Sequence, residues 1–281
     1  MSRLESVKRT VCRWFSSIPF FVLLGLILGC FISVAVIPKP NIGIISISSP
    51  LVEQTYTDNI LDMLKYARDN NNIKAVVLQI NSPGGSASDI EPIYLEVLRL
   101  RQQKPVVASV GTIAASGGYY IAIASNFIYA EPTSLLGSIG AWSSLPHPEE
   151  LGEDVITSGP FKATGGSGRK ALSMLETMKQ QFSTAVTSQR GDRLKLSGDE
   201  LSRAEIYSGT ESLRYGLIDA IGTRTTDAIA KAASLAGIRN YGVVKLEIRQ
   251  PSSWLSLLSM KDLKARTGLT PTYYYLYFES E

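Results

Sequence analysis

The sequence predicts an α/β domain whose parallel sheet is covered by helices, preceded by one N-terminal transmembrane helix. Short apolar runs such as 75–80 (AVVLQI) and 105–110 (PVVASV) alternate with longer segments of helical periodicity. These runs are almost continuously apolar, which is typical of parallel strands buried on both faces of a sheet. A longer stretch, 18–37, is apolar and carries no charge, and it stands before the first strand.

The stretch 18–37 is predicted to be a membrane anchor. A helix of about 20 apolar residues spans the hydrocarbon core of a bilayer. Lys8, Arg9 and Arg13 precede the stretch, and positively charged flanks stay on the cytoplasmic side. We therefore expect a single-pass protein of the cell membrane, with its N-terminus in the cytoplasm and the remainder of the chain outside it.

Two other interpretations of this N-terminus stay open. A cleaved signal peptide would have a shorter apolar core and a small-residue cleavage site. A lipid-modified Cys30 would end an apolar run, whereas here the run continues beyond it. The favoured division of the chain is a cytoplasmic segment 1–14, an anchor 15–37, a folded domain 41–250 and a C-terminal tail 251–281.

The folded domain is predicted to alternate strands and helices. One apolar stripe at helical spacing runs from Leu172 to Val186 and predicts a long helix there. The remaining expected strands are 42–48, 75–80, 105–110, 127–130 and 243–248, and the expected helices are 55–70, 86–103, 115–124, 201–206 and 225–236.

Composition excludes several classes of protein. The chain has two cysteines, Cys12 and Cys30, both N-terminal, so the folded domain can hold neither a disulfide nor a thiolate metal site. Its single histidine, His147, stands between two prolines. No metal and no cofactor are implied. The net charge of +3 is spread along the chain, so nucleic acid is not an expected partner.

Two glycine-rich turns follow successive predicted strands. Residues 81–86 (NSPGGS) follow the strand 75–80, and 114–120 (AASGGYY) follow 105–110. The carboxyl ends of parallel strands are where ligands bind. Paired glycines there allow backbone N–H groups to approach a developing negative charge, as in an oxyanion hole. Ser116 stands in the second turn and could be a nucleophile, although a helix-capping serine explains it equally well from the turn alone.

A nucleophilic serine needs a base. His147 lies in a proline-rich segment that is typical of a solvated loop, so a lysine is favoured. A lysine can act as a base when burial lowers its pKa from about 10.4 by some 2–3 units. Lys162 has small and aromatic neighbours and is preferred over Lys170, whereas Lys179 and Lys195 have the charged surroundings of surface residues.

Taken together, these motifs resemble the signal peptide peptidase A family of serine peptidases. They are NSPGGS (81–86), ASGGYY (115–120), PTSLLGSIG (132–140), SGPFKA (158–163), IYSG (206–209) and YGLID (215–219). The resemblance covers about 42–236 and implies a Clp-protease/crotonase-like fold with a Ser–Lys dyad.

The resemblance also assigns roles to individual residues. It implies that Ser116 is the nucleophile and Lys162 the base. Gly85 and Gly117 would donate the N–H groups of the oxyanion hole, and Ser138 could orient the lysine.

Partners follow from the same resemblance. The implied substrates are cleaved signal peptides and other unfolded apolar peptides near the membrane. The implied assembly is a ring- or dome-shaped homo-oligomer whose neighbouring subunits share the dyad, and the aromatic tail could occupy a peptide-binding groove in it. Two other functions stay open: a crotonase-type acyl-CoA enzyme, which the anchor disfavours, and a membrane scaffold without catalysis.

Overall fold

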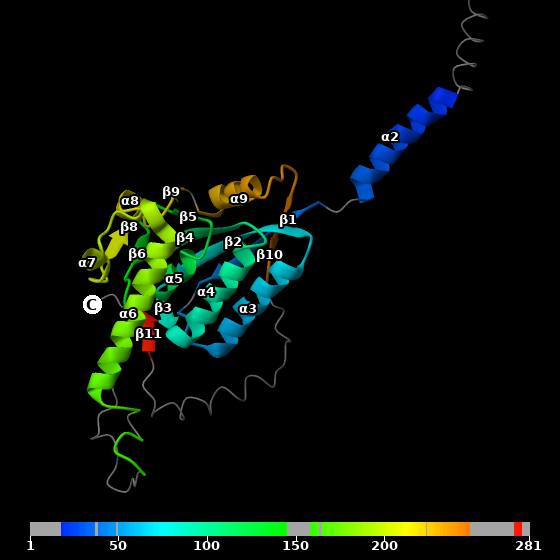
Figure 1. Ribbon diagram of the computed structural model, residues 1–281. Coiled ribbons are helices and arrows are strands. Elements are labelled where there is room, and N and C mark those ends of the chain that lie inside the picture. Colours follow the sequence, from blue (N-terminus) through cyan, green and yellow to red (C-terminus); the bar gives the residue numbers. More distant parts are fainter. Residues whose placement is uncertain are drawn as a thin grey trace, which may run out of the picture. The chain divides into compact units, whose positions relative to one another are not determined.

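The computed structural model describes residues 18–36, 39–48, 50–144, 158–162, 165–222, 224–247 and 273–276 (Figure 1). The chain divides into two compact units, Met1–Lys39 and Pro40–Glu281, which are treated separately below.

The first unit contains a single described helix, α2 (Ile18–Val36), within the stretch predicted to be an anchor. Across the described part of the chain, no helix has both the length and the apolar character needed to cross a membrane. The anchor therefore stays a prediction.

The second unit is built on an eight-stranded sheet. Six strands follow one another across it, and neighbours along this path are parallel. Their order is β10 (Gly242–Lys245), β1 (Asn41–Ile47), β2 (Ile73–Ser82), β4 (Val106–Ala115), β5 (Phe127–Ala130) and β9 (Ala220–Ile221). The predicted strands 42–48, 75–80, 105–110, 127–130 and 243–248 are thus all present. The bounds of 127–130 are as predicted, and the other four have shifted ends.

The sheet is not purely parallel, because two short strands extend it at one end. β6 (Leu135–Gly137) pairs with the second half of β4 in parallel, and β8 (Ile206–Ser208) pairs with β6 in antiparallel orientation. β4 consequently continues to Ala115, beyond the predicted end at residue 110, because β6 supplies a partner that local sequence does not reveal.

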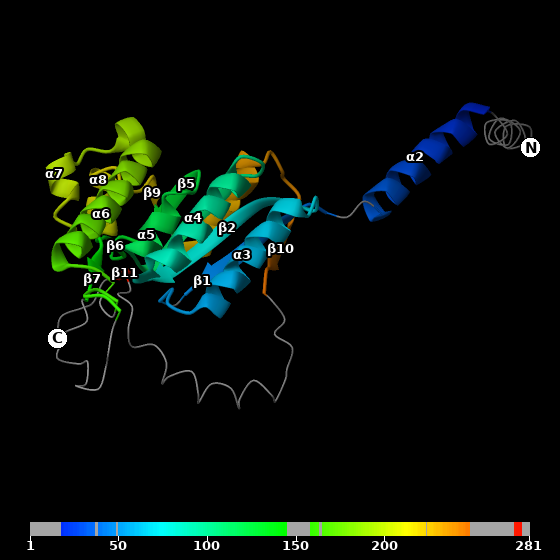
Figure 2. The same ribbon diagram turned by 60° about the horizontal axis from the view of Figure 1, so that its bottom comes forward.

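Helices cover both faces of the sheet (Figures 1 and 2). One core lies between the sheet and α3 (Gln54–Asp69), α4 (Ala87–Arg101) and α5 (Gly117–Ala122), which Figure 2 shows side by side. The second core lies under α9 (Arg224–Leu235). β1 serves both: Ile42 and Ile44 face α9, and Ile45 and Ile47 face the other core. Burial on both faces explains why the strands are continuously apolar.

Further helices surround the end of the sheet that carries β6 and β8. The predicted apolar stripe forms α6 (Gly168–Arg190), followed by a short 3₁₀ turn (Gly191–Arg193), α7 (Gly198–Leu201) and α8 (Gly209–Arg214).

The predicted helix over 201–206 is wrong. The side chain of Ser197 caps α7, so the helix starts at Gly198, three residues before the predicted start, and ends at Leu201. Ala204 then has a φ of +56°, which a right-handed helix cannot contain. Ile206 already belongs to β8, whose pairing with β6 outweighs the helical pattern.

A separate three-stranded sheet has no counterpart among the predicted elements. Its order is β3 (Gly84–Ser86), β11 (Tyr273–Leu276) and β7 (Trp142–Ser143), and both pairings are antiparallel. β3 comes from the first glycine-rich turn, and β11 comes from the C-terminal tail (Figure 1, red).

Candidate active site

Ser116 occupies the sharp turn between β4 and α5. Its φ of +51° and ψ of −119° lie outside the regions that non-glycine residues normally adopt. The turn is held on both sides, because the Ser116 N–H donates to the carbonyl of Gly137 (2.8 Å) and its carbonyl accepts from the N–H of Tyr120 (2.9 Å). Strained strand-to-helix turns of this kind present nucleophiles in other hydrolases.

Ser138 occupies the corresponding position on the neighbouring strand. Ala115 at the end of β4 pairs with Gly137 at the end of β6, so Ser116 and Ser138 each follow one member of this pair. Ser138 also has a positive φ, +52°, and its N–H donates to the carbonyl of Glu205 (2.8 Å). The structure therefore brings these two predicted site residues to adjacent strand ends.

The glycines after Ser116 allow α5 to start close to β2. A Cβ atom on Gly118 would stand 2.4 Å from the carbonyl oxygen of Ser82, so this position accepts only glycine without a shift of the backbone. Gly117 is the first residue of α5, and first-turn N–H groups have no acceptor within a helix. The N–H of Gly117 thus belongs to the residue directly after the candidate nucleophile, the position of one oxyanion-hole donor in other hydrolases.

Gly85 is enclosed in a different way. A Cβ atom on it would stand 1.9 Å from the carbonyl oxygen of Leu51. Leu51 is hydrogen bonded to both neighbours of Gly85: the Ser86 N–H donates to the Leu51 carbonyl (2.7 Å), and the Leu51 N–H donates to the Gly84 carbonyl (2.8 Å). Backbone groups of successive strand residues point to opposite sides. The N–H of Gly85 therefore points away from Leu51, toward β11.

Two tyrosines that follow Ser116 hold α5 in place. The hydroxyl of Tyr119, which is fully buried, donates to the carbonyl of Leu217 (2.8 Å). Tyr120 stacks on Tyr94 of α4 (ring centroids 4.3 Å apart) and meets Phe182 of α6 edge-on (4.8 Å). Aromatic pairs in these geometries are worth about 0.5–1.5 kcal/mol each beyond the area they bury.

A buried ion-pair cluster holds the segment that Tyr119 contacts. The carboxylate of Asp219 accepts from Arg190 (2.9 and 3.0 Å), from Arg193 (2.8 Å) and from the N–H of Ile128 (2.8 Å). Arg190 also donates to the carbonyl of Gly216 (2.7 Å). The YGLID motif is visible in the sequence but this role is not, since the contacts join residues far apart in the chain.

One ionisable group lies beside β3. Burial raises the pKa of Asp89, in the first turn of α4, and the nearby hydroxyls of Thr57 and Ser86 oppose this rise. The Asp89 carboxyl therefore takes up a proton at a higher pH than an exposed aspartate does.

Lys162 is not brought to Ser116 by any contact among the described residues. It lies exposed in a turn in which its own N–H donates to the carbonyl of Gly159 (3.1 Å). Lys170, Lys179 and Lys195 are not buried either. The single chain does not give Lys162 the burial that a lysine base needs. His147 lies outside the described residues.

A lysine with a lowered pKa does exist, but at the wrong end of the sheet. Burial lowers the pKa of Lys104, whose ammonium group donates to the carbonyls of Ala67 and Asn70 (2.7 Å each). Lys104 precedes β4 and Ser116 follows it. The ten residues of β4 separate them by about 33 Å, at about 3.3 Å per strand residue. Lys104 therefore cannot activate Ser116.

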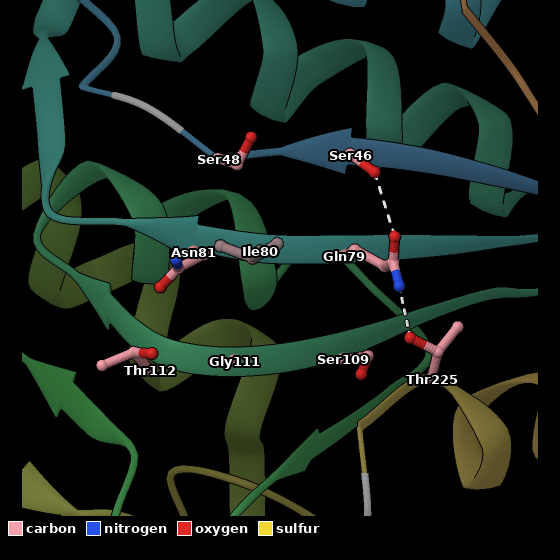
Figure 3. A pocket seen from close by; sticks show the side chains of 9 residues that line it. All are labelled: Ser46, Ser48, Gln79, Ile80, Asn81, Ser109, Gly111, Thr112 and Thr225. Atoms are coloured by element: carbon pink, nitrogen blue, oxygen red, sulfur yellow. Dashed lines mark hydrogen bonds between the residues drawn. The ribbon is translucent and has the colours of Figure 1, made fainter.

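A polar cavity of about 250 Å³ lies at β1, β2 and β4, apart from these residues (Figure 3). In it the hydroxyl of Ser46 donates to the Gln79 side chain (3.0 Å), whose amide group in turn donates to Thr225. Neither Ser116 nor any other predicted site residue lines it. Its lining has hydroxyls and amides but no base, so it is not the candidate active site. No group of metal-ligating side chains that could hold an ion occurs in the described part of the chain.

Comparison with known proteins shows the family of this chain. The profile of peptidase family S49 matches residues 99–239, and that of the Clp protease family matches 41–133. The chain is 32% identical over 198 residues to Protease 4 of Salmonella typhi. The aligned region covers 66% of this chain and 32% of that protein. It is also 31% identical over 213 residues to the chloroplastic serine protease SPPA of Arabidopsis thaliana. That aligned region covers 70% of this chain and 31% of the Arabidopsis protein. The chain thus spans about a third of the length of these relatives.

Solved structures show the same fold. A lysine-to-alanine mutant of the 1510-N membrane-bound stomatin-specific protease, in complex with a substrate peptide, superposes with a TM-score of 0.51. The match is 19% identical and covers 79% of this chain and 98% of that one. A serine-to-alanine mutant of the same protease superposes equally well. With the S49 profile matching half of its residues, over the segment that carries Ser116, Lys162 and the YGLID motif, this chain belongs to peptidase family S49.

Proposed function

We propose that this chain is a membrane-anchored serine endopeptidase that hydrolyses remnant signal peptides or other unfolded apolar peptides near the membrane. The observation that carries the proposal is the geometry of Ser116. It stands on a strained strand-to-helix turn directly before Gly117, and the helix α5 that begins there contacts the glycine strand β3, which pairs with an extended segment. Membership of family S49 supports a serine peptidase.

The reaction follows from the named residues. The hydroxyl oxygen of Ser116 attacks the peptide carbonyl, and its proton passes to the amine of Lys162. The N–H groups of Gly85 and Gly117 stabilise the oxyanion, an interaction worth about 3–4 kcal/mol per donor in other serine hydrolases. The lysine then protonates the leaving amine, and water hydrolyses the acyl-enzyme.

The exposure of Lys162 supports an assembly of several subunits. Its neighbour Phe161 is also exposed, as are Trp142, Leu172 and Met174. A homo-oligomeric ring or dome that buries these side chains would desolvate Lys162 and make it a base. Ser138 is proposed to orient that lysine from the strand end beside Ser116.

The anchor remains part of the proposal. Residues 18–37 carry no charge, and the basic residues before them support a cytoplasmic N-terminus with the peptidase domain outside the cytoplasm. A substrate left in the membrane after signal-peptide cleavage would then lie close to the domain.

Hydrolysis of a fluorogenic apolar peptide by the full chain in detergent tests the proposal. Ser116→Ala and Lys162→Ala should each lose at least about 1,000-fold in kcat, as loss of an activated nucleophile or its base does elsewhere. Ser109→Ala is the matched control, because Ser109 is a buried serine of β4, the strand that leads to Ser116, and it lines the separate polar cavity. This variant should retain activity.

Other outcomes would redirect the assignment. If Lys162→Ala stays active while Lys170→Ala is inactive, the base is Lys170. If the assembled wild type cleaves no peptide and forms no acyl-enzyme detectable by mass spectrometry, the proposal is wrong and a scaffold role is favoured.

A further inference from the structure

The strand that leads to Ser116 exchanges one neighbour for another shortly before it ends. β4 pairs with β5 over residues 107–110 and with β6 over residues 113–115, and Ser116 follows directly. The course of β4 through this change of partner therefore sets the position at which the candidate nucleophile is presented.

On its other edge, β4 has a bulge at the same place. Its pairing with β2 steps from Ile80–Val110 to Ser82–Ala114, so β2 advances by two residues over this step and β4 by four. The bulge is defined here as residues 111–113. Bulges bend a strand, interrupt its ladder of hydrogen bonds and re-aim the residues that follow, and they are common beside active sites.

The Asn81 side chain bonds β2 to the bulge. Its Oδ1 atom accepts from the N–H of Ile113 (3.2 Å), so β2 still holds β4 where the regular pairing is interrupted. Figure 3 shows the Asn81 side chain between β2 and the part of β4 that carries Gly111 and Thr112. Asn81 belongs to the NSPGGS motif, of which the proposed reaction uses only a glycine.

Ser134 bonds the bulge from the opposite side. Its hydroxyl donates to the carbonyl of Gly111 (2.5 Å) and accepts from the N–H of Glu131 (3.0 Å). Ser134 is 2% exposed and directly precedes β6, the strand that pairs with the last residues of β4. It therefore connects the start of β6 to the bulge, a role that explains this serine of the PTSLLGSIG motif.

The backbone between the bulge and the candidate nucleophile is short. Only Ala114 and Ala115 separate Ile113 from Ser116, whose N–H donates to the carbonyl of Gly137 at the end of β6. The positive φ of Ser116 persists only if the surrounding structure imposes it. Bonds from β2 and from the start of β6 to the bulge fix how β4 meets β6, and they thereby help to impose this conformation.

We propose that Asn81 and Ser134 are positioning residues for the reaction at Ser116, because they bond the bulge of β4 to its two neighbours and so hold the strained turn that presents the nucleophile. The inference rests on the proposed function and deepens it. Within the described part of the chain, neither side chain is hydrogen bonded to Ser116. Both therefore act through the backbone of β4, on the rate of the chemical step.

Two substitutions of Asn81 in the full chain test the role of its oxygen. Asn81→Leu removes the acceptor at similar size, whereas Asn81→Asp keeps an oxygen in the same place. Asn81→Leu should lower kcat by about 3- to 10-fold with KM unchanged, since one hydrogen bond is typically worth that factor. Asn81→Asp should keep most of the wild-type kcat. An equal loss of kcat in both variants would overturn the role of the acceptor.

Asn126→Leu is the matched control for Asn81→Leu. Asn126 is also an exposed asparagine whose Oδ1 atom accepts from an N–H of β4, but that N–H belongs to Val106, at the start of the strand (2.8 Å). Asn126→Leu should lower the melting temperature about as much as Asn81→Leu does and leave kcat unchanged. If both variants lower kcat equally, the bond at the bulge is ordinary structural support and the proposal is wrong.

Ser134→Ala removes both hydrogen bonds of the second positioning residue. It should lower kcat by about 10-fold or more with KM unchanged, because two bonds are lost at a buried position. Ser125→Ala is its control, since Ser125 is a buried serine whose hydroxyl has no partner within the described residues. That variant should keep the wild-type kcat. A wild-type kcat in Ser134→Ala would refute the role of Ser134.

Amide hydrogen exchange, followed by mass spectrometry, separates this inference from the proposed function. Peptides that cover residues 111–118 should exchange about 3- to 10-fold faster in Asn81→Leu than in the wild type or in Asn126→Leu, because the lost bond eases local opening. If the wild type cleaves no peptide but this difference is found, the proposed function fails while the hold on the turn stands. Unchanged exchange over 111–118 in Asn81→Leu overturns the inference whatever the activity.

Discussion

Ser116 and Ser138 show how a strained residue marks a site. Both are non-glycine residues with positive φ, and they stand at adjacent strand ends. Such conformations cost on the order of 1–3 kcal/mol each and persist only where the surrounding structure imposes them. At Ser116 the constraints come from Gly137 and Tyr120. The sequence motif identified Ser116, but nothing local in the sequence predicted the strain.

Gly118→Ala tests the close approach of α5 to β2. The new Cβ atom would stand 2.4 Å from the Ser82 carbonyl oxygen, so α5 must shift and carry the Ser116 turn with it. We expect a loss of stability of about 1–3 kcal/mol, as overpacking typically causes, and at least a 10-fold loss of kcat/KM. Denaturant unfolding and peptidase assays measure the two effects.

Gly198→Ala is the control for this substitution. A Cβ atom there meets nothing within 4 Å, and Gly198 begins α7 far along the chain from Ser116. It should keep full activity and wild-type stability or better. A Gly118→Ala chain that also keeps both would show that the contact with Ser82 is not limiting.

At the scale of elements, helix caps are clearer in the sequence than strand partners. Ser197 with Glu200 and Ser208 with Glu211 each form a capping box, and these boxes start α7 and α8 where the S-x-x-E spacing indicates. The helix predicted over 201–206 rested on apolar spacing alone, whereas the capping box at Ser197 marks the start of the helix correctly.

The capping boxes predict an acid-dependent loss of stability. Hydrogen bonds from the backbone N–H and hydroxyl of Ser208 hold the pKa of Glu211 below its ordinary 4.5, and those from Ser197 do the same for Glu200. A pKa depressed by folding contributes stability above the unfolded value and loses it as pH falls through the folded value. The stability that Glu211 contributes is therefore present at neutral pH and fades below about pH 4.5.

Melting temperatures of wild type and Glu211→Gln between pH 3 and pH 7 check this. The wild type should melt higher at pH 7, and the difference should shrink toward acid pH. Glu91→Gln, at an exposed position of α4 with no side-chain hydrogen bond among the described residues, is the matched control. A Glu211→Gln difference that does not change with pH would contradict the assignment.

At the scale of the whole molecule, the described residues of one chain do not bring the two proposed site residues together. Ser116 is buried, while Lys162 is exposed in a turn without a contact to it among the described residues. Exposed apolar side chains near that turn in sequence, Phe161 and Leu172, are typical of a surface that another subunit covers.

Leu172→Glu should therefore weaken assembly and activity together. Leu172 is 67% exposed on α6, and a charge buried in a subunit interface is costly. Analytical ultracentrifugation should show smaller species, with activity per chain lowered in proportion to the assembly lost. Leu213→Glu, at a 39% exposed position on α8, is the matched control and should assemble normally. If Leu172→Glu assembles and cleaves like wild type, this surface is not the interface.

The sequence by itself determined the elements whose stability is local. The strands β1, β2, β4, β5 and β10 and the helices α3, α4, α6 and α9 all follow from periodicity, since apolar spacing within a segment dictates which face is buried. It also placed Ser116 at a strand-to-helix turn.

Only the tertiary structure decided the rest. The pairing of β4 with β6, of β8 with β6, and of the tail with β3 and β7 joins segments far apart in the chain. A short strand has no signal of its own, because its hydrogen bonds belong equally to a partner that periodicity cannot identify. The same reason applies to Tyr119 and Leu217, whose bond depends on how α5 meets the Asp219 cluster. Local sequence specifies which segments become strands and helices, and long-range packing specifies which of them meet.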